Sequence, residues 1–340
     1  MKELSDQQRL FLVESDQLYR IFREMVWRQN DYRYAMRWKN VNGNDYLVRL
    51  TSASGHGRSL GVRSESTEAI YQNFQDGRAL ALDKFSGLKD KLAIQTRLNR
   101  AMRLGRLPTV VAEILLKLDE VQALSEFRVV GTHALFAYEA MGAVEFKMEL
   151  LASGDVDLLY DIRQHISIVA KKFDGHGLLG LLKKVDKTFE VKASERFRAV
   201  NKDGFMVDFF ITQDKGMSYV KPEAMSAGDL ELVEVPNLEW LANSPRVESI
   251  VIASSGLPVL MPVPDPRAFS LHKAWLSQQA DREPVKKQRD FNQAVMVLKL
   301  LQEYLPNFPL KPDEMRYFPK KVVQSSIASL TQGLIGLDNA

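Results

Sequence analysis

The 340-residue sequence contains no cysteine, and this absence excludes several kinds of chemistry. Without thiols there are no disulfides, no thiolate metal sites and no cysteine nucleophile. Long apolar runs are also missing, because no stretch approaches the length needed to cross a bilayer. Acidic residues interrupt the apolar stretch near the N-terminus, so we expect no signal peptide there. These absences predict a cytoplasmic protein without membrane attachment.

The overall composition is that of an ordinary folded protein. Hydrophobic residues make up 45% and charged residues 26%, which argues against wholesale disorder, and the length favours two or three structural units. The formal net charge is only +3, but 17 Lys and Arg stand against 8 Asp and Glu between Arg20 and Arg106. This local excess suits either phosphate binding or a solvated basic surface, and composition does not decide between them.

The first part of the chain, residues 1–125, is predicted to be a helical and β-hairpin module. Residues 36–41 and 45–50 have the pattern of strands, and Asn42-Gly43 between them is typical of a tight hairpin turn. A glycine-rich connection follows at 52–64. Helical spacing of apolar residues and helix-boundary signals predict helices over about 3–30, 66–102 and 108–124.

The next part, residues 126–265, has a mixed α/β pattern, and residues 266–340 are helical again. Thr132 is expected to be the N-cap of a helix. Short apolar runs predict strands at 127–131, 155–161, 205–212, 248–254 and 257–263. Further helices are predicted at 132–141, 166–173, 176–185, 269–304 and about 320–334. The expected fold is α+β, with a mixed-sheet core between the N-terminal module and a C-terminal helical part.

Three aspartates stand in two of the predicted strands. Asp155 and Asp157 are two residues apart, so their side chains project from one face while Val156 and Leu158 face a core. Asp208 interrupts another apolar run, where a lone acid needs a partner. Neighbouring carboxylates repel each other unless a hard cation bridges them, so this set suits two Mg²⁺ ions. An exposed strand end with a salt-bridged Asp208 would show the same residues without a metal.

Gly131 and Thr132 end the first of these strands and open a helix. A glycine there lets a phosphate approach the backbone, and the hydroxyl and free N–H groups at the helix start can donate to an anion. A packing glycine followed by a simple N-cap would use the same two residues. His133 and His272 are interpreted as solvated or capping groups.

The order of these residues resembles a known signature. Gly131-Thr132, followed by Asp155-Val-Asp157 and then Asp208, is similar to the signature of the DNA polymerase β nucleotidyltransferase superfamily. Two departures are Thr132, where Gly or Ser is usual, and a longer gap before Asp155, into which an extra loop or strand must fit.

Two longer segments carry the resemblance further. Residues 129–161 and 264–294 are similar to one bacterial nucleotidyltransferase family of that fold, whose acceptor is not well defined. Within the second segment, Lys273 and Arg289-Asp290 are similar to two motifs of the abortive-infection type IV toxin nucleotidyltransferases.

The resemblance implies a Mg²⁺-dependent enzyme that moves a nucleoside monophosphate from an NTP to an acceptor hydroxyl and releases pyrophosphate. It implies that Gly131 and Thr132 bind the phosphates and that Lys273 neutralises the triphosphate. Asp290 would anchor either Lys273 or a nearby arginine. The implied metal ligands are Asp155, Asp157 and Asp208, the last of which would also help to deprotonate the acceptor. A catalytically inactive nucleic-acid-binding module and a toxin-like enzyme silenced by an antitoxin are the alternative hypotheses.

A basic segment at residues 91–106 bears on the acceptor. Leu98, Met102 and Leu104 are expected to face a core beneath a helical stripe of basic side chains without any acid among them. Such a stripe suits a phosphate backbone and favours structured RNA such as tRNA as acceptor, whereas a solvated basic helix would need no ligand. The stripe comprises Lys91, Arg97, Arg100, Arg103 and Arg106.

Overall fold

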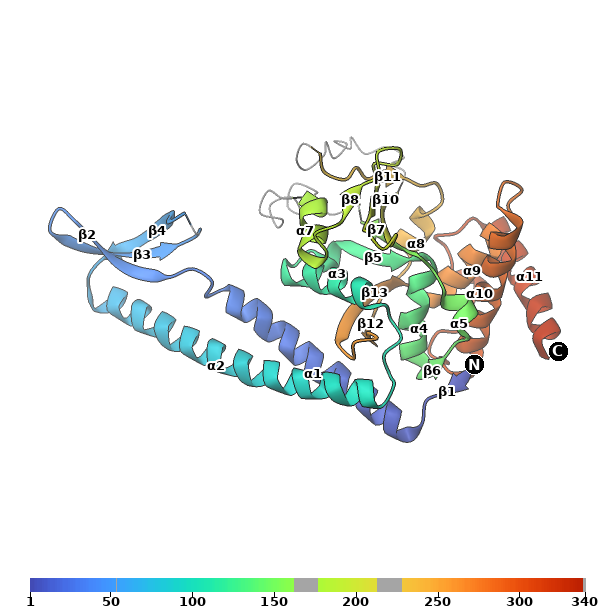
Figure 1. Cartoon of the computed structure of the whole chain (residues 1–340), viewed down its shortest axis with the longest axis horizontal. Coiled ribbons are helices and arrows are strands. Elements are labelled where there is room, and N and C mark those ends of the chain that lie inside the picture. The colour runs from blue at the N-terminus through green and yellow to red at the C-terminus, as the bar shows by residue number, and fades with distance from the viewer. Residues whose placement is uncertain (53, 162–176, 213–227, 339–340) are drawn as a thin grey trace. The chain divides into compact units, whose positions relative to one another are not determined.

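A computed structural model describes residues 1–52, 54–161, 177–212 and 228–338 (Figure 1). The fold is mixed α+β, as predicted, and the chain divides into two compact units. Residues 14–98 form one unit, and residues 1–13 together with 99–340 form the other. Within the described ranges, none of the helices combines the length and apolar character needed to span a bilayer. The helix predicted at 166–173 lies outside the described residues.

The unit of residues 14–98 contains a three-stranded antiparallel sheet and most of two long helices. Asn42 and Gly43 join the first two strands with φ values of 52° and 82°, which confirms the predicted hairpin. The predicted connection at 52–64 is wrong in part, because residues 57–62 pair with the preceding strand. A Cβ on Gly57 would lie 2.7 Å from the Arg49 carbonyl oxygen, so glycine permits close strand pairing here. The elements are α1 (Asp6–Asn30), β2 (Met36–Val41), β3 (Asn44–Leu50), β4 (Gly57–Val62) and α2 (Glu65–Ala101).

The other unit is built on a mixed sheet with six strands among the described residues. In hydrogen-bonded order they are β5 (Phe127–Val130), β7 (Asp155–Tyr160), β10 (Met206–Ile211), β9 (Arg198–Val200) and β8 (Glu190–Val191), with β11 (Val233–Glu234) pairing the end of β10. Strands β7 and β10 are parallel, while β5 and β9 run antiparallel to them. In this register Asp157 lies beside Asp208 on one neighbouring strand and beside Val130 on the other.

The chain between β5 and β7 supplies the extra structure that the long gap requires. It consists of η2 (Gly131–His133), α4 (Ala134–Gly142), β6 (Val144–Glu145), which pairs with β1 (Lys2–Glu3), and α5 (Met148–Leu151). Thr132 is not the N-cap of α4, which begins only after the 3₁₀ turn and has no side-chain cap. Its hydroxyl instead accepts a hydrogen bond from Gln293 Nε2 at 3.3 Å.

The remaining elements surround this sheet within the same unit. The strands predicted at 248–254 and 257–263 are confirmed, and they pair antiparallel as a hairpin with Gly256 at φ 88° in its turn. The single helix predicted at 269–304 is instead two helices, because Pro284 lacks an N–H and starts the second at its first turn. The elements are α3 (Thr109–Glu120), η1 (Leu124–Glu126), α7 (Gly177–Val185), α8 (Glu239–Asn243), β12 (Arg246–Ile252), β13 (Pro258–Pro264), α9 (Pro266–Ser277), α10 (Pro284–Glu303), η3 (Pro312–Glu314) and α11 (Lys320–Asp338).

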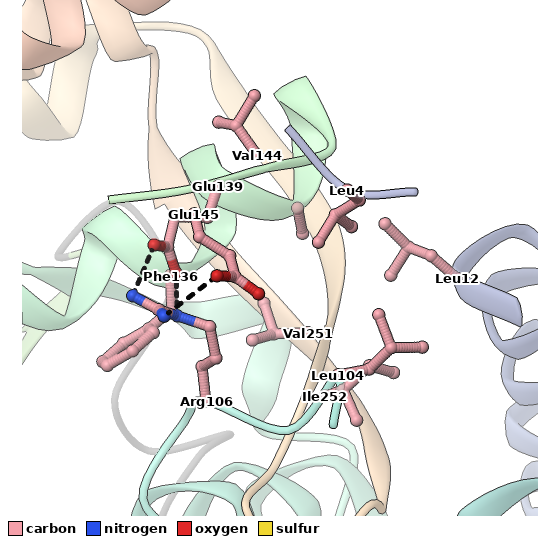
Figure 2. A pocket seen from close by; sticks show the side chains of 11 residues that line it. Leu4, Leu12, Leu104, Arg106, Phe136, Glu139, Val144, Glu145, Val251 and Ile252 are labelled. Carbon is pink, nitrogen blue, oxygen red and sulfur yellow. Dashed lines mark hydrogen bonds and ion pairs between the residues drawn. The ribbon is translucent and has the colours of Figure 1, made fainter. Parts of the chain in front are cut away.

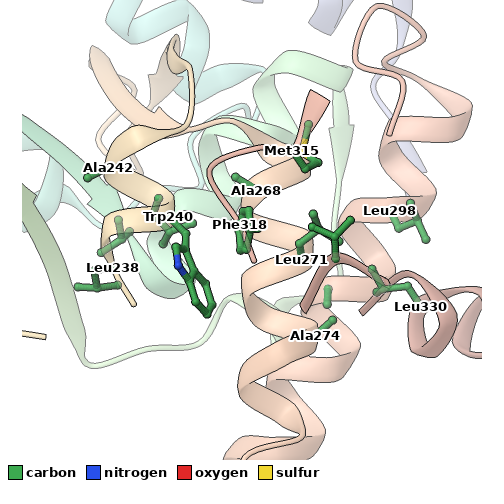
Figure 3. Packing of buried hydrophobic residues seen from close by; sticks show 14 of the residues in the cluster. Leu238, Trp240, Ala242, Ala268, Leu271, Ala274, Leu298, Met315, Phe318 and Leu330 are labelled. Carbon is green, nitrogen blue, oxygen red and sulfur yellow. The ribbon is translucent and has the colours of Figure 1, made fainter. Parts of the chain in front are cut away.

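Helix α9 is amphipathic in a way that positions functional groups. Ala268, Leu271 and Ala274 recur at helical spacing and pack into a buried cluster with Leu298 of α10 and Leu330 of α11 (Figure 3). The positions on the other side of the helix line a cavity. They are Phe269, His272, Lys273 and Leu276.

The predicted basic stripe is wrong at its C-terminal end. Helix α2 stops at Ala101, and a Cβ on Gly105 would lie 2.1 Å from the Ala253 carbonyl oxygen, so the chain leaves the helix to pass close to the β12–β13 hairpin. Arg106 donates to the buried Glu139 carboxylate at 2.9 and 3.1 Å (Figure 2). It also donates to the Phe146 carbonyl at 2.7 Å. It therefore serves packing, and Leu98, which was expected to face a core, is 38% exposed.

Candidate active site

The three aspartates meet on one face of the sheet. One oxygen from each of Asp155, Asp157 and Asp208 lies within 4.8 Å of the other two. The parallel register of β7 and β10 brings them together, because Asp208 is the direct partner of Asp157. Val156 and Leu158 are buried on the other face, as expected from the period of a strand. Three carboxylates at this spacing are compatible with binding a divalent cation.

Asp157 is a half-buried acid with two acidic neighbours. Burial first, and then the charges of Asp155 and Asp208, raise its pKa to about 7, while Lys273 and Arg198 oppose the shift. A cation among the three carboxylates would remove this repulsion. The donor set of hard oxygen atoms therefore fits magnesium or a similar ion.

Asp208 is held by an arginine that the sequence analysis did not identify. Arg198 of β9 donates from Nε to Oδ1 at 2.7 Å and from Nη2 to Oδ2 at 2.6 Å, and its Nη1 reaches Glu195 at 2.9 Å. The salt-bridged Asp208 that was weighed as an alternative to a metal site is thus present together with the carboxylate cluster. The signal in the sequence was weak, because Arg198 meets Asp208 only through the antiparallel pairing of β9 with β10.

Gly131 lies directly against the cluster. Its φ is 64°, and a Cβ at this position would lie 2.1 Å from Asp157 Oδ2. The next residue, Thr132, is buried, and its hydroxyl is held by Gln293, whose Nε2 also donates to the Leu150 carbonyl at 2.7 Å. Gln293 is a second residue that the sequence analysis missed.

Lys273 and Asp290 form the buried ion pair that the resemblance implies. Lys273 is 5% exposed, and its Nζ donates to Asp290 Oδ1 at 2.6 Å. Arg282 donates to the other oxygen of Asp290 at 2.8 Å, so one carboxylate anchors two cations. Burial lowers the pKa of Lys273, and the charge of Asp290 opposes this effect.

A cavity of about 280 Å³ joins most of these groups. One part of its wall is polar and carries charge of both signs, from Gly131, Asp155, Asp157, Lys273, Arg282 and Arg289. Another part is apolar and is formed by Phe210, Val235, Leu238, Leu241, Phe269 and Leu276. Such a cavity can accept a ligand that has a multiply charged end and a flat apolar end.

Both histidines, interpreted as solvated or capping groups, are buried, so neither is solvated. His133 stands at the N-cap position of α4 but makes no side-chain cap hydrogen bond. His133 is 1% exposed and contacts the rings of Phe136 and Phe205, and burial lowers its pKa to about 4. His272 packs against Trp240 and Trp275, and burial lowers its pKa to about 3. One aromatic neighbour of each histidine, Phe205 for His133 and Trp240 for His272, comes from a distant segment, which the local sequence does not reveal.

Replacing Gly131 with Ala is expected to weaken Mn²⁺ binding by about tenfold or more. The methyl group would displace the Asp157 carboxylate and would also strain the left-handed backbone. Isothermal titration of the metal-free protein with Mn²⁺ measures the effect. Gly154→Ala is the matched control, because a Cβ there meets nothing within 4 Å. Equal affinities for both variants and the unmodified protein would contradict metal binding by the Asp157 carboxylate, which Gly131 lies against.

Replacing Asp157 with Asn is expected to stabilise the metal-free protein at pH 8 but not at pH 4. The folded-state pKa of about 7 is above the unfolded value, so the stability that protonated Asp157 contributes is complete below about pH 4 and is lost as the pH rises through 7. Asn does not titrate, so the free energy of unfolding of the variant should exceed that of the unmodified protein by about 4 kcal/mol at pH 8.

Urea denaturation in EDTA at several pH values measures this difference. Glu139, whose pKa burial also raises to about 7, and the two buried histidines titrate in both proteins and cancel. A difference that does not change with pH would contradict the raised pKa of Asp157.

Comparison with known proteins places these observations in a family. A family model described as Nucleotidyltransferase matches residues 109–317, which is more than half of the chain. The matched segment contains all three aspartates, Gly131 and the Lys273–Asp290 pair. No curated protein and no solved structure matches the chain.

Proposed function

The chain belongs to this nucleotidyltransferase family and is an enzyme of that class, and from this premise we propose a reaction and a site for it. The proposed reaction moves a nucleoside monophosphate from an NTP to an acceptor hydroxyl. The acceptor oxygen bonds to the α-phosphorus, pyrophosphate leaves, and the hydroxyl proton passes to a base. The observation that carries the proposal is the meeting of three carboxylates within 4.8 Å beside a cavity that also holds Lys273.

Asp155, Asp157 and Asp208 are the proposed ligands of two Mg²⁺ ions. Bound magnesium would neutralise charge on the phosphates and orient the reacting oxygens. The fit is supported by the hard oxygen donors and by the repulsion that raises the pKa of Asp157. The resemblance also implies that Asp208 helps to deprotonate the acceptor. For this role Arg198 would have to release one of the two Asp208 carboxylate oxygens.

The triphosphate is proposed to lie along the polar wall of the cavity. Gly131 leaves its backbone open to phosphate, and Thr132 Oγ1 accepts from Gln293, so the hydroxyl proton can be donated to a phosphate oxygen. Lys273 supplies a positive charge that Asp290 holds in place. The apolar wall suits the face of the nucleobase, because stacking and apolar contact need no hydrogen bonds.

The wider relationships belong to the same proposal. The order of Gly131, the two acids of β7 and the acid of β10 supports a DNA polymerase β-like core. The Lys273–Asp290 pair supports similarity to the abortive-infection type IV toxins, for which an antitoxin partner stays a prediction. An RNA acceptor also stays a prediction, now with less support, because Arg106 is engaged in packing and Arg103 lies beyond the end of α2.

One assay tests the proposed reaction and searches for the acceptor. The protein is incubated with Mg²⁺, each of the four labelled NTPs, and pools of RNA, proteins or small hydroxyl compounds. Pyrophosphate release and transfer of the labelled nucleotide are measured with and without EDTA. We expect release that needs both Mg²⁺ and an acceptor. Absence of release with every NTP and every acceptor pool would contradict the proposal.

A further inference from the structure

Arg198 occupies a position next to the cluster where its charge bears directly on cation binding. Its guanidinium contacts both oxygens of Asp208, and the two groups lie on adjacent strands in direct register. Asp208 is 2% exposed, so this pair is well shielded from water. A bidentate pair with arginine is among the strongest charge-assisted contacts of a carboxylate. The hydrogen bonds with Asp208 also raise the pKa of Arg198 above its ordinary value, so it remains charged.

The same arginine has a second acidic partner outside the cluster. Nη1 of Arg198 donates to Glu195 Oε2 at 2.9 Å, and Lys192 Nζ donates to the same oxygen at 2.6 Å. The side chain of Glu195 is 35% exposed, compared with 19% for Arg198 and 3% for Asp208. Arg198 therefore bridges a buried carboxylate of the cluster and a more exposed one beside it.

We propose that Arg198 is a built-in counter-cation that competes with the divalent metal for Asp208 and shifts toward Glu195 when the metal binds. This inference rests on the proposed function, because it assumes that Asp208 is a metal ligand. Arg198 touches no reacting atom in this scheme and acts through Asp208 as a positioning residue. Its role is to hold the acids together without metal and to set how tightly the metal binds.

The physical reason is the charge of the cluster. Three ionised aspartates attract a divalent cation more strongly than three aspartates of which one is neutralised by a guanidinium. Lys273 contributes less opposing charge, because Asp290 is its direct partner. The metal alone should therefore bind weakly, and it should bind better with a triphosphate, whose oxygens add ligands and negative charge.

The decisive experiment is titration of the metal-free protein with Mn²⁺ at pH 8, without nucleotide. Arg198→Gln removes the competing charge and is expected to tighten Mn²⁺ binding by about tenfold or more. Arg198→Lys keeps a charge but loses the bidentate contact, so a gain of about threefold is expected. The matched control is Arg196→Gln, which removes the same charge from the same segment, where it pairs with the exposed Glu231. The control should bind Mn²⁺ as the unmodified protein does.

Glu195→Gln provides a test of opposite sign. When Glu195 is neutral, the contact that would stabilise Arg198 away from Asp208 is weaker, and Arg198 competes more strongly with the metal. Mn²⁺ binding should therefore weaken by about threefold or more. A merely structural role for Arg198 would not produce opposite changes in the two variants. Glu195→Gln keeps Arg198, and Arg198→Lys keeps a positive charge at this position. These two variants therefore test the counter-cation role even if Arg198→Gln does not fold.

The outcomes separate this inference from the proposed metal site. If Asp157→Asn loses Mn²⁺ binding while no Arg198 variant binds more tightly than the unmodified protein, the counter-cation role is wrong and the metal site stands. If Asp157→Asn binds Mn²⁺ as the unmodified protein does, the metal site itself is wrong. Tighter binding by the two Arg198 variants, with weaker binding by Glu195→Gln, supports the inference.

Discussion

Replacing Asp157 with Asn is expected to lower the rate of pyrophosphate release by at least about a thousandfold while the protein stays folded. Asp157 is the central acid of the cluster, since Asp208 is its partner across the parallel strands and Gly131 lies against its carboxylate. Asn keeps the shape of the side chain but removes the charge that would hold a metal. The loss should appear at saturating NTP and Mg²⁺, because it affects the chemical step and not only substrate binding.

The control for this prediction is an aspartate outside the cluster. Asp281 is exposed and is not part of the cavity wall, so Asp281→Asn makes the same chemical change and should keep full activity. The variant Asp157→Asn should also unfold at no lower urea concentration than the unmodified protein at pH 8, which excludes misfolding as the cause of its inactivity. Full activity in Asp157→Asn would exclude the carboxylate cluster as the site of the reaction.

The parts of the site that lie within a single strand or helix were predictable from the sequence. The spacing of Asp155 and Asp157 fixes a shared face because side chains alternate along any strand. Asp208 was identified as an isolated acid in an apolar run, and the resemblance added Lys273, but their meeting depends on the parallel register of β7 with β10 and on the packing of α9 beside the sheet. Those are properties of the folded chain, and the local pattern does not contain them.

The residues that were missed act through contacts between different secondary-structure elements. Arg198 reaches Asp208 by strand pairing, and Gln293 reaches Thr132 across 161 positions of the sequence. Arg106 fits a helical repeat of basic residues, yet Gly105 beside it passes against Ala253 and ends that repeat. Local periodicity shows which face of a helix or strand is apolar, but not which other element packs against that face, and this explains these errors.

The predicted division of the chain into three parts, with boundaries after residues 125 and 265, stays a prediction.

Replacing Lys273 with Met is expected to lower kcat/KM for the NTP by about a hundredfold or more. Lys273 is buried in the wall of the cavity, where its charge is screened less than at a surface, and charge that develops on the departing phosphates is stabilised best by such a fixed cation. The burial of Lys273 also removes the possibility that it is merely a surface residue. Lys273→Arg keeps the charge with a different shape, so part of the activity should return.

Lys273→Met should still fold, because Asp290 keeps Arg282 as a partner after the lysine is removed. Mn²⁺ binding without nucleotide should be kept or should tighten, since a positive charge near Asp157 is lost. This combination, intact metal binding with slow transfer, distinguishes a role toward the triphosphate from a general collapse of the site. Lys287→Met on α10, which is not part of the cavity wall, is the control and should behave as the unmodified protein. If Lys273→Met keeps more than about a third of the original kcat/KM, a contribution of its charge to the reaction is excluded.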